Sequence, residues 1–321
     1  MDSVSQLVLG ASVSMAAMGR KAPLWQSALV GAFCGTLPDL DVFLDHGDAI
    51  SNMTLHRTES HALVWLTLVS PLLAWLIAGV VRQRFQWVHW WPAVWLALIT
   101  HPLLDLMTVY GTQLGLPFTD YPWAIGSIYI VDPLYTLPLI ICLIVALWRR
   151  QPRWSRIGLL LSSTYLLWSM AAQSIAIHQV APQVAQQLGE KPRLLVTPTA
   201  FNTLVWRVVA VTPERYYEGY WSLLSPRRPL QLSVQDRGMA LYQQLKGDAY
   251  TERVAWFSHG FFAMQQRDGK LLIGDLRMGE APNFTFTFDL GRPDARDPHP
   301  SRLPSARPSL AQTWQQFRQR L

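Results

Sequence analysis

Pro38-Asp39-Leu40-Asp41, followed by His56-Arg57-Thr58-Glu59-Ser60-His61, places ionisable side chains in a chain that is otherwise strongly apolar. A third segment, His101-Pro102-Leu103-Leu104-Asp105, begins forty residues after His61. Charged groups near hydrocarbon are costly unless they are paired or ligated. Carboxylates and imidazoles together are ligands that zinc or manganese accepts. The three segments therefore predict a metal site at one face of a helical membrane bundle.

The composition is typical of a membrane protein. Of the 321 residues, 50% are hydrophobic and only 15% are charged. The 15 Trp residues suit anchoring at a membrane interface. The net charge of +6 comes from Lys and Arg in short loops and in the C-terminal third, without the basic, aromatic-rich stripe of a nucleic-acid-binding surface. We expect a lipid bilayer as a partner and no nucleic acid.

Two further features bear on the cellular setting. Cys34 and Cys142 both lie in apolar runs, which favours two small buried hydrophobic residues over a disulfide. The chain begins Met1-Asp2-Ser3, and no Lys or Arg precedes Arg20, which follows the first apolar run. A cleavable signal peptide is therefore not expected.

Apolar runs predict a mainly α fold with about six membrane spans. They cover residues 4–18, 24–37, 61–81, 88–106, 133–148 and 157–177. The first two are shorter than the ~20 residues of a full span, so a re-entrant pair or a buried soluble hairpin remains an alternative. Gly31 and Gly35 favour two closely packed spans. We expect residues 39–60 to form a polar loop and residues 108–131 a Gly/Pro/aromatic-rich loop.

The composition changes after about His178, where charges become frequent and apolar residues alternate. This change predicts a membrane-embedded domain over residues 1–178, which carries the metal site, and a small soluble α+β domain over residues 179–321. An antiparallel sheet with strands near 203–209, 216–224, 271–276 and 284–288 would be joined by helices near 238–245 and 250–258. Residues 291–308 are expected to be loosely ordered, and 310–320 to form an amphipathic helix.

Basic residues predict the orientation. Arg20, Lys21, Arg82 and Arg84, and four Arg residues between 149 and 156, follow the first, third and fifth runs. These three loops would be cytoplasmic under the positive-inside rule. The ends of the runs that carry the carboxylates and imidazoles, the start of the fifth run at Asp132, and the C-terminal domain then face outward. In a bacterium this side of the inner membrane is the periplasm.

Residue spacing suggests how the ligands could converge. His101 and Asp105 are four apart and share a helix face. Asp39 and Asp41 are two apart, so in an extended stretch after Pro38 their side chains would point the same way. Taken singly, either pair also has a simpler explanation. An Asp at a helix end is often only a cap, and a His and an Asp one turn apart can form a structural hydrogen bond.

The predicted metal ligands are Asp39, Asp41, His56, His61, His101 and Asp105. Six ligands are too many for one tetrahedral zinc ion. Either two ions ~3.5–4 Å apart share them, or one ion binds some of them. Glu59, between His56 and His61, is a candidate general base or further ligand. Arg57 could bind a phosphate group through its planar guanidinium.

These motifs resemble the YdjM/YbcI-like family of bacterial inner-membrane proteins, which are regarded as metal-dependent hydrolases. The resemblance covers roughly residues 1–150. It rests on Asp2, Ser3, Gln6, Leu9, Gly10 and Ala11, on Gly35 to Asp41, on His56 to Ala62, on His101 with Asp105, and on residues 110–113 and 130–135. The box from His56 to Ala62 departs from the family in three places, with Thr58 for Gly, Ser60 for Thr and Ala62 for Ser. Both imidazoles of the box are kept.

The resemblance implies a membrane-bound metal-dependent hydrolase. A site at the outer face of the inner membrane would suit a phosphoester or related bond in a lipid or lipid-linked substrate, with zinc the first choice of metal and manganese the second. The alternative is a non-catalytic, metal-binding membrane scaffold that presents the C-terminal domain to partners. A transporter is disfavoured, because the ionisable groups gather at one face instead of lining the midplane.

Overall fold

The computed structural model describes residues 1–293, 295–305 and 309–321. About half of the chain is helical, and a β-sheet domain follows toward the C-terminus. The chain divides into two compact units. The first unit contains Met1–Phe43, Arg57–Met170 and Ala200–Asn202, and the second contains Leu44–His56, Ala171–Thr199 and Thr203–Leu321. The predicted domain boundary after residue 178 falls inside one long helix, α7 (Arg153–Leu188).

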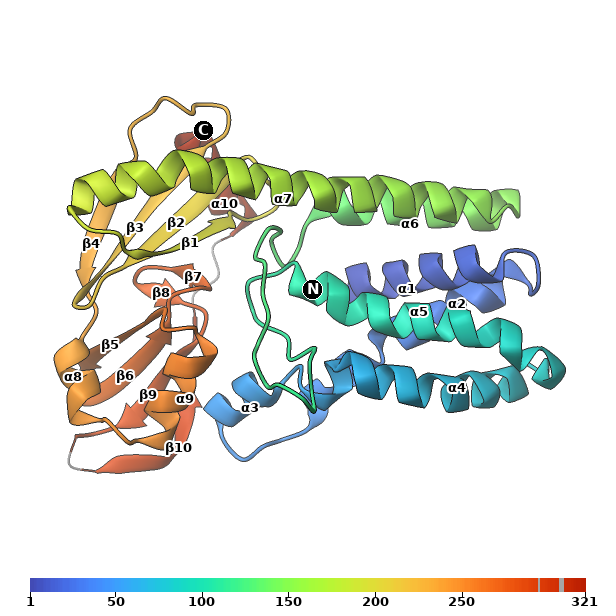
Figure 1. The fold of residues 1–321 in the computed structure, drawn as a ribbon, viewed down its shortest axis with the longest axis horizontal. Coiled ribbons are helices and arrows are strands. Elements are labelled where there is room, and N and C mark those ends of the chain that lie inside the picture. The colour runs from blue at the N-terminus through green and yellow to red at the C-terminus, as the bar shows by residue number, and fades with distance from the viewer. Residues whose placement is uncertain (294, 306–308) are drawn as a thin grey trace. The chain divides into compact units, whose positions relative to one another are not determined.

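Helices form at all six apolar runs. They are α1 (Ser3–Met18), α2 (Leu24–Thr36), α4 (Leu63–Val80), α5 (Trp87–Leu106), α6 (Pro133–Arg149) and α7. Short 3-10 helices η1 (Pro38–Phe43), η2 (Glu59–His61) and η3 (Arg84–Gln86) lie between them. Figure 1 shows α1, α2, α4, α5 and α6 lying side by side as a bundle in the first unit.

Two of the described helices, α4 and α7, are long and apolar enough to cross a membrane, and α1 and α6 are shorter apolar helices. Only 28% of the residues of α4 are buried. Leu68, Leu72 and Val80 of α4 are 63%, 59% and 82% exposed. An outward surface of this kind suits contact with lipid. A count of six spans stays a prediction.

Small residues bring α1 and α2 into close contact. A Cβ atom at Gly31 would lie 2.2 Å from the Gly10 carbonyl oxygen, and one at Gly35 would lie 2.7 Å from the Gln6 carbonyl oxygen. Only glycine allows two helix backbones to approach this closely. Asp2 caps α1, because its carboxylate accepts hydrogen bonds from the backbone amides of Val4 and Ser5. This cap fixes the residue at which α1 begins.

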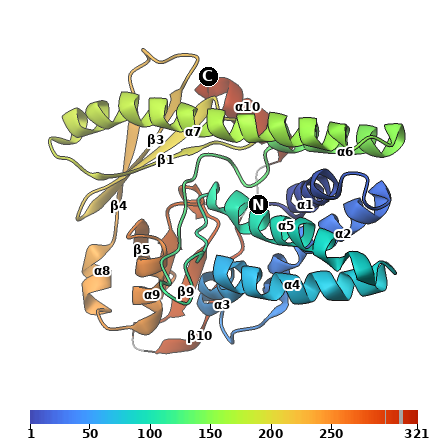
Figure 2. The same cartoon turned by 45° about the vertical axis from the view of Figure 1, so that its right-hand side comes forward.

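The second unit is built on two antiparallel four-stranded sheets. The first has the order β1-β2-β3-β4, with β1 (Arg193–Pro198), β2 (Val205–Val211), β3 (Arg215–Ser222) and β4 (Leu232–Asp236). The C-terminal half of α7 lies across this sheet (Figures 1 and 2). Ala172, Ala176, Val180 and Val184 form one buried cluster with Trp206 and other sheet residues. The helix therefore continues to Leu188, beyond the end of the apolar run at 177, because the small apolar residues of its second half pack on the sheet.

The other sheet has the order β10-β9-β6-β5, with β5 (Phe262–Arg267), β6 (Lys270–Asp275), β9 (Thr287–Gly291) and β10 (Arg296–Arg302). A small ladder joins β7 (Gly279–Glu280) to β8 (Asn283–Phe284). The helices of this unit, besides α7, are α3 (Ala49–Leu55), α8 (Met239–Gln244), α9 (Ala249–Phe257) and α10 (Leu310–Arg320). The amphipathic helix predicted at 310–320 is thus present as α10.

Several local predictions were wrong. The polar loop at 39–60 contains the helix α3, which Asp48 caps through the amides of Ile50 and Ser51. The expected loose order of 291–308 is wrong over β10, which pairs with β9, while residues 294 and 306–308 of that stretch lie outside the described residues. The single strand expected at 284–288 is split between β8 and β9. Strands β1, β4 and β5 were missed altogether.

Candidate metal centre

Four predicted ligands come together in the first unit. Asp39 lies in η1, His61 ends η2, and His101 and Asp105 lie one turn apart on α5. One ligand atom of each residue lies within 4.8 Å of the other three. The side chains of His61, His101 and Asp105 are fully buried, and that of Asp39 is 20% exposed. The four residues form a possible metal-binding site.

The spacing of the ligand atoms matches a tetrahedral ion. The five distances that involve an imidazole Nε2 atom, to the other Nε2, to Asp39 Oδ1 or to Asp105 Oδ2, all lie between 3.1 and 3.4 Å. Ligands about 2.0–2.1 Å from a tetrahedral zinc ion lie about 3.3–3.4 Å from one another. The donor atoms are thus as far apart as the ligands of one small divalent cation.

Hydrogen bonds fix the tautomer of both imidazoles. His101 Nδ1 is 2.6 Å from the Gly35 carbonyl oxygen, which can only accept, so Nδ1 carries the proton. Ser60 Oγ donates to Asp41 Oδ2 at 2.7 Å and therefore accepts from His61 Nδ1 at 2.9 Å. A neutral imidazole protonated at Nδ1 keeps its lone pair on Nε2. Both lone pairs consequently point at the same place, where they would repel unless a proton or a cation lies between them.

Asp105 is held so that one oxygen atom remains available. Its Oδ1 accepts from Gln6 Nε2 at 3.0 Å, faces Arg57 Nη2 at 3.2 Å and contacts the amino group of Met1. Its Oδ2 is buried and has no hydrogen-bond partner among the described residues. Metal ligands are commonly oriented in this way by hydrogen bonds on the atom that does not bind the metal.

Asp39 offers a second available oxygen atom. Its Oδ1 is also buried without a hydrogen-bond partner in the part of the chain that the structure describes. Two buried, unsatisfied carboxylate oxygens beside two imidazole lone pairs form a set of donors suited to a divalent cation.

Arg57 adds a cationic group beside the cluster. Its side chain is only 4% exposed and lies over the Tyr110 ring, with Cζ 4.9 Å from the ring centroid. Besides the contact of Nη2 with Asp105, its Nε and Nη1 atoms are buried and have no hydrogen-bond partner among the described residues. Buried guanidinium donors without partners are costly. They can be satisfied by an anionic group that enters the site.

The remaining predicted residues lie outside this group of four. Asp41 Oδ2 accepts from Ser60 Oγ and from the Arg57 amide and lies 3.6 Å from His61 Nδ1, so this carboxylate orients His61. The predicted extended stretch at Asp39 and Asp41 is wrong, because Pro38 begins the 3-10 helix η1. The two carboxylates nevertheless lie close together, with one oxygen atom of each within 4.8 Å of the other. His56 belongs to the second unit, where it ends α3, and Glu59 is exposed at the start of η2. Asp132 caps α6.

Sequence reasoning assigned no ligand-orienting role to three residues that shape the centre. Gln6 donates to both the His101 carbonyl and Asp105, Ser60 links Asp41 to His61, and the Gly35 carbonyl orients His101. Gln6 stands alone as an amide in an apolar helix, which was a usable signal, because a buried amide needs hydrogen-bond partners. Ser60 and Gly35 gave no signal of their own, since their roles depend on contacts made only in the folded chain.

Comparisons with known proteins agree with the resemblance described above. No solved structure matches the chain. The uncharacterized protein YfhP of Bacillus subtilis (strain 168) is 20% identical over 230 residues, which is 68% of this chain and 68% of that protein. Residues 1–176 match the YdjM inner membrane protein family. The match covers more than half of the chain, including all the residues of the metal centre, and the chain therefore belongs to the YdjM inner membrane protein family.

Proposed function

We propose that this membrane protein is a metal-dependent hydrolase that cleaves a phosphoester or related bond in a lipid or lipid-linked substrate. The observation that carries the proposal is the buried group of Asp39, His61, His101 and Asp105, whose donor atoms have the spacing of a tetrahedral ion's ligands. A zinc or manganese ion held there would polarise the scissile bond and lower the pKa of water to near neutrality.

Arg57 supports a phosphorylated substrate. It lies beside the cluster with two buried donors that no described residue satisfies. A guanidinium binds phosphate through paired, charge-assisted hydrogen bonds, so Arg57 would orient the substrate and stabilise the charge on its oxygens. Glu59 is exposed and close in sequence to His61, and we propose it as the group that accepts a proton from the attacking water.

The proposed location is the outer face of the inner membrane, with the C-terminal domain in the periplasm. The support is the asymmetry of Lys and Arg between successive loops. Exposed apolar side chains along α4 and α7, such as Leu68 and Leu167, suit a protein that meets its substrate within the bilayer. Proteolysis of the C-terminal domain in intact spheroplasts tests this orientation.

A non-catalytic, metal-binding scaffold is the second candidate, and one observation favours it. Four protein ligands at tetrahedral spacing fill the coordination sphere of zinc, as in structural sites, whereas catalytic zinc keeps a position open. The partial exposure of Asp39 favours the catalytic candidate, because this ligand is the one that solvent or substrate can reach. The two candidates differ in activity but not in metal content.

The test is phosphate or alcohol release from total lipid extracts by the purified full chain in detergent, with zinc, with manganese and after chelation. We expect release that requires metal and is lost in Asp105→Ala. Arg57→Gln should keep the metal and lose at least about tenfold in activity, because a charge-assisted hydrogen bond is lost. Arg82→Gln, an exposed arginine at the end of α4, is the matched control. A metal-loaded protein that releases nothing would favour the scaffold.

A further inference from the structure

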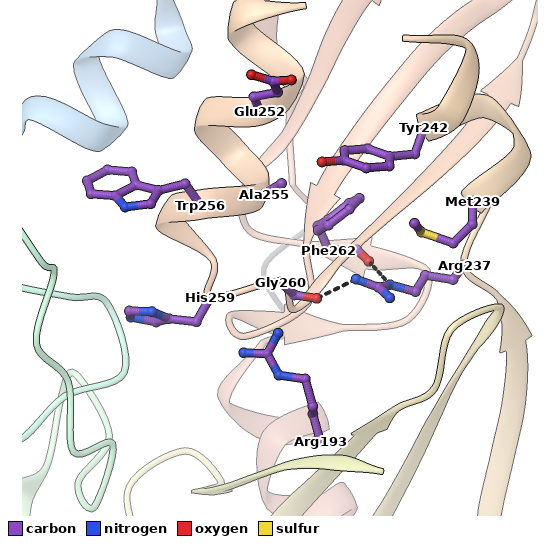
Figure 3. Close-up of a pocket in the computed structure, with 10 residues that line it drawn as sticks. All are labelled: Arg193, Arg237, Met239, Tyr242, Glu252, Ala255, Trp256, His259, Gly260 and Phe262. Atoms are coloured by element: carbon purple, nitrogen blue, oxygen red, sulfur yellow. Dashed lines mark hydrogen bonds between the residues drawn. The ribbon is translucent and has the colours of Figure 1, made fainter. Parts of the chain in front are cut away.

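The second unit contains a pocket that the proposed hydrolase does not use. Its volume is about 570 Å³. Its walls come from the starts of β1 and β5, from α8 and α9, and from the turns beside them (Figure 3). The lining residues that matter are two arginines, Arg193 and Arg237, three aromatic residues, Tyr242, Trp256 and Phe262, and His259 and Glu252.

Arg237 is held in a fixed position at this pocket. It donates from Nη2 to the Gly260 carbonyl at 2.6 Å, from Nε to that of Phe262 at 3.1 Å and from Nη1 to that of Thr212 at 3.2 Å. Its guanidinium also lies over the Phe262 ring, 4.7 Å from the centroid. All these partners are neutral. Among the described residues no carboxylate pairs with Arg237, so its positive charge is uncompensated.

Arg193 brings a second positive charge to the same place. Its Nη1 lies so close to Gly260 that a Cβ atom there would be 2.5 Å away, and Figure 3 shows its side chain directed toward Gly260 and Arg237. Its guanidinium lies over the Phe261 ring, with Cζ 5.5 Å from the centroid. Burial, and next the charge of Arg193, lowers the pKa of Arg237. The two guanidinium groups thus act on each other, with no acid between them.

The rest of the wall is largely aromatic. Tyr242 packs on Phe262 with ring centroids 4.9 Å apart, and Trp256 is 40% exposed on α9. Glu252 lines the end of the pocket remote from Arg193, and its carboxylate accepts a hydrogen bond from the Gly247 amide. A small-molecule site usually combines apolar walls with a few polar groups that converge. Here the converging groups are cationic.

We propose that this pocket binds a small organic anion, with its phosphate, phosphonate or carboxylate group on Arg193 and Arg237 and an aromatic or other flat apolar body against Trp256 and Tyr242. Guanidinium groups bind such oxyanions through charge-assisted hydrogen bonds. The bound anion would also relieve the repulsion between the two arginines. The pocket lies wholly within the second unit and does not depend on the metal centre.

The test uses phenylphosphonate, which has no ester bond to hydrolyse, and isothermal titration calorimetry on the full chain in detergent after chelation of metals. We expect saturable one-site binding. Arg193→Gln should weaken the binding of phenylphosphonate at least about tenfold, because a charge-assisted hydrogen bond is lost. Arg237 is unchanged in this variant, so its hydrogen bonds to the carbonyl groups at the pocket remain. Arg227→Gln removes the same charge at another exposed arginine of this unit and should leave the affinity unchanged.

A second variant tests the aromatic wall. Trp256→Ala should weaken the binding of phenylphosphonate while leaving that of inorganic phosphate nearly unchanged, because phosphate has no ring to pack on the indole. The proposal is overturned if phenylphosphonate shows no saturable binding, or if Arg193→Gln binds it as tightly as the unaltered chain. Loss of metal-dependent hydrolysis in the lipid assay, with phenylphosphonate binding kept, would reject the proposed hydrolase and leave this site standing.

Discussion

His61 and His101 face each other through Nε2 atoms 3.1 Å apart, and the ring planes are inclined at 65°. A hydrogen bond holds each ring in place. The Gly35 carbonyl accepts from His101 Nδ1, and Ser60 Oγ accepts from His61 Nδ1. The fold therefore holds two lone pairs together in a fully buried place that also contains carboxylates. Such an arrangement is stable when a cation satisfies all the donors at once.

Metal content is the first prediction. Purified protein should contain a tightly bound divalent metal, and His61→Ala or Asp105→Ala should abolish it, because each change removes one of the four ligands. His89→Ala is the matched control, since His89 is exposed on the same helix as His101 and outside the cluster. Elemental analysis by inductively coupled plasma mass spectrometry measures the stoichiometry. Full occupancy in both ligand variants would refute the site.

A milder effect is expected at Asp41. Its carboxylate accepts from Ser60 Oγ and so fixes the His61 tautomer from a distance. Asp41→Asn should therefore weaken metal affinity by about 10–100-fold without abolishing binding, which is the usual effect of losing an outer-shell partner. Competition with a chromophoric chelator gives the affinity. A loss as complete as in Asp105→Ala would show instead that Asp41 binds the metal directly.

Close packing of α1 on α2 gives a stability prediction. In Gly31→Ala the new methyl group would lie 2.2 Å from the Gly10 carbonyl oxygen and 2.5 Å from Ser14 Cβ. Since both neighbours belong to a packed helix, the helices must separate, at a cost of about 1–3 kcal/mol or more. The midpoint of thermal unfolding in detergent should fall clearly.

Gly79→Ala is the control for that prediction. Gly79 lies inside α4, and its new methyl group would meet only the flexible Arg84 side chain, at 3.2 Å. Replacing glycine by alanine within a helix usually stabilises it by about 0.5–1 kcal/mol, so the unfolding midpoint should stay or rise. Equal midpoints for the two variants would contradict the close contact between α1 and α2.

The sequence was sufficient to single out the four residues that come together in the candidate metal centre. Asp39, His61, His101 and Asp105 are rare charged or imidazole groups among apolar runs, and the cost of isolating such groups makes them informative. Residue spacing was less reliable. The relation of His101 to Asp105 follows from helix periodicity and is present in α5, whereas the relation of Asp39 to Asp41 depended on a local conformation that Pro38 turned into a 3-10 helix.

Contacts between residues that are distant in the sequence could not be predicted from the sequence alone. After Ile177 the sequence of α7 contains His178 and four glutamines, so hydropathy alone placed the end of the helix too early. The helix continues to Leu188 because Val180 and Val184 pack on the β1–β4 sheet. Strand β10 contains Pro298 and Pro300, a composition typical of loose segments, yet pairing with β9 gives it order. The pocket arginines Arg193 and Arg237 lie 44 residues apart and look like ordinary surface charges until the fold brings them together.

The last prediction concerns pH and the C-terminal helix. Arg320 of α10 makes a double hydrogen bond to Glu280, with both N–O distances 2.8 Å, and lies 3.6 Å from the Tyr220 ring centroid. Burial raises the pKa of Glu280, but the hydrogen bonds and the charge of Arg320 outweigh burial and lower it. A carboxyl whose pKa is lower in the folded state stabilises the fold above its unfolded pKa, and this contribution is lost as the pH falls through the folded pKa.

Arg320→Gln should therefore loosen α10 at pH 7 and have little effect near pH 3. The pair is partly exposed, with side chains 18% and 35% accessible, so its contribution is about 1 kcal/mol at most, or about fivefold in protection of the α10 amides. Hydrogen exchange, corrected for the intrinsic rate at each pH, measures this protection. Arg318→Gln removes the same charge from an exposed position of α10 and should change protection at neither pH. An effect of Arg320→Gln that persisted undiminished at pH 3 would show that α10 is held by contacts other than Glu280.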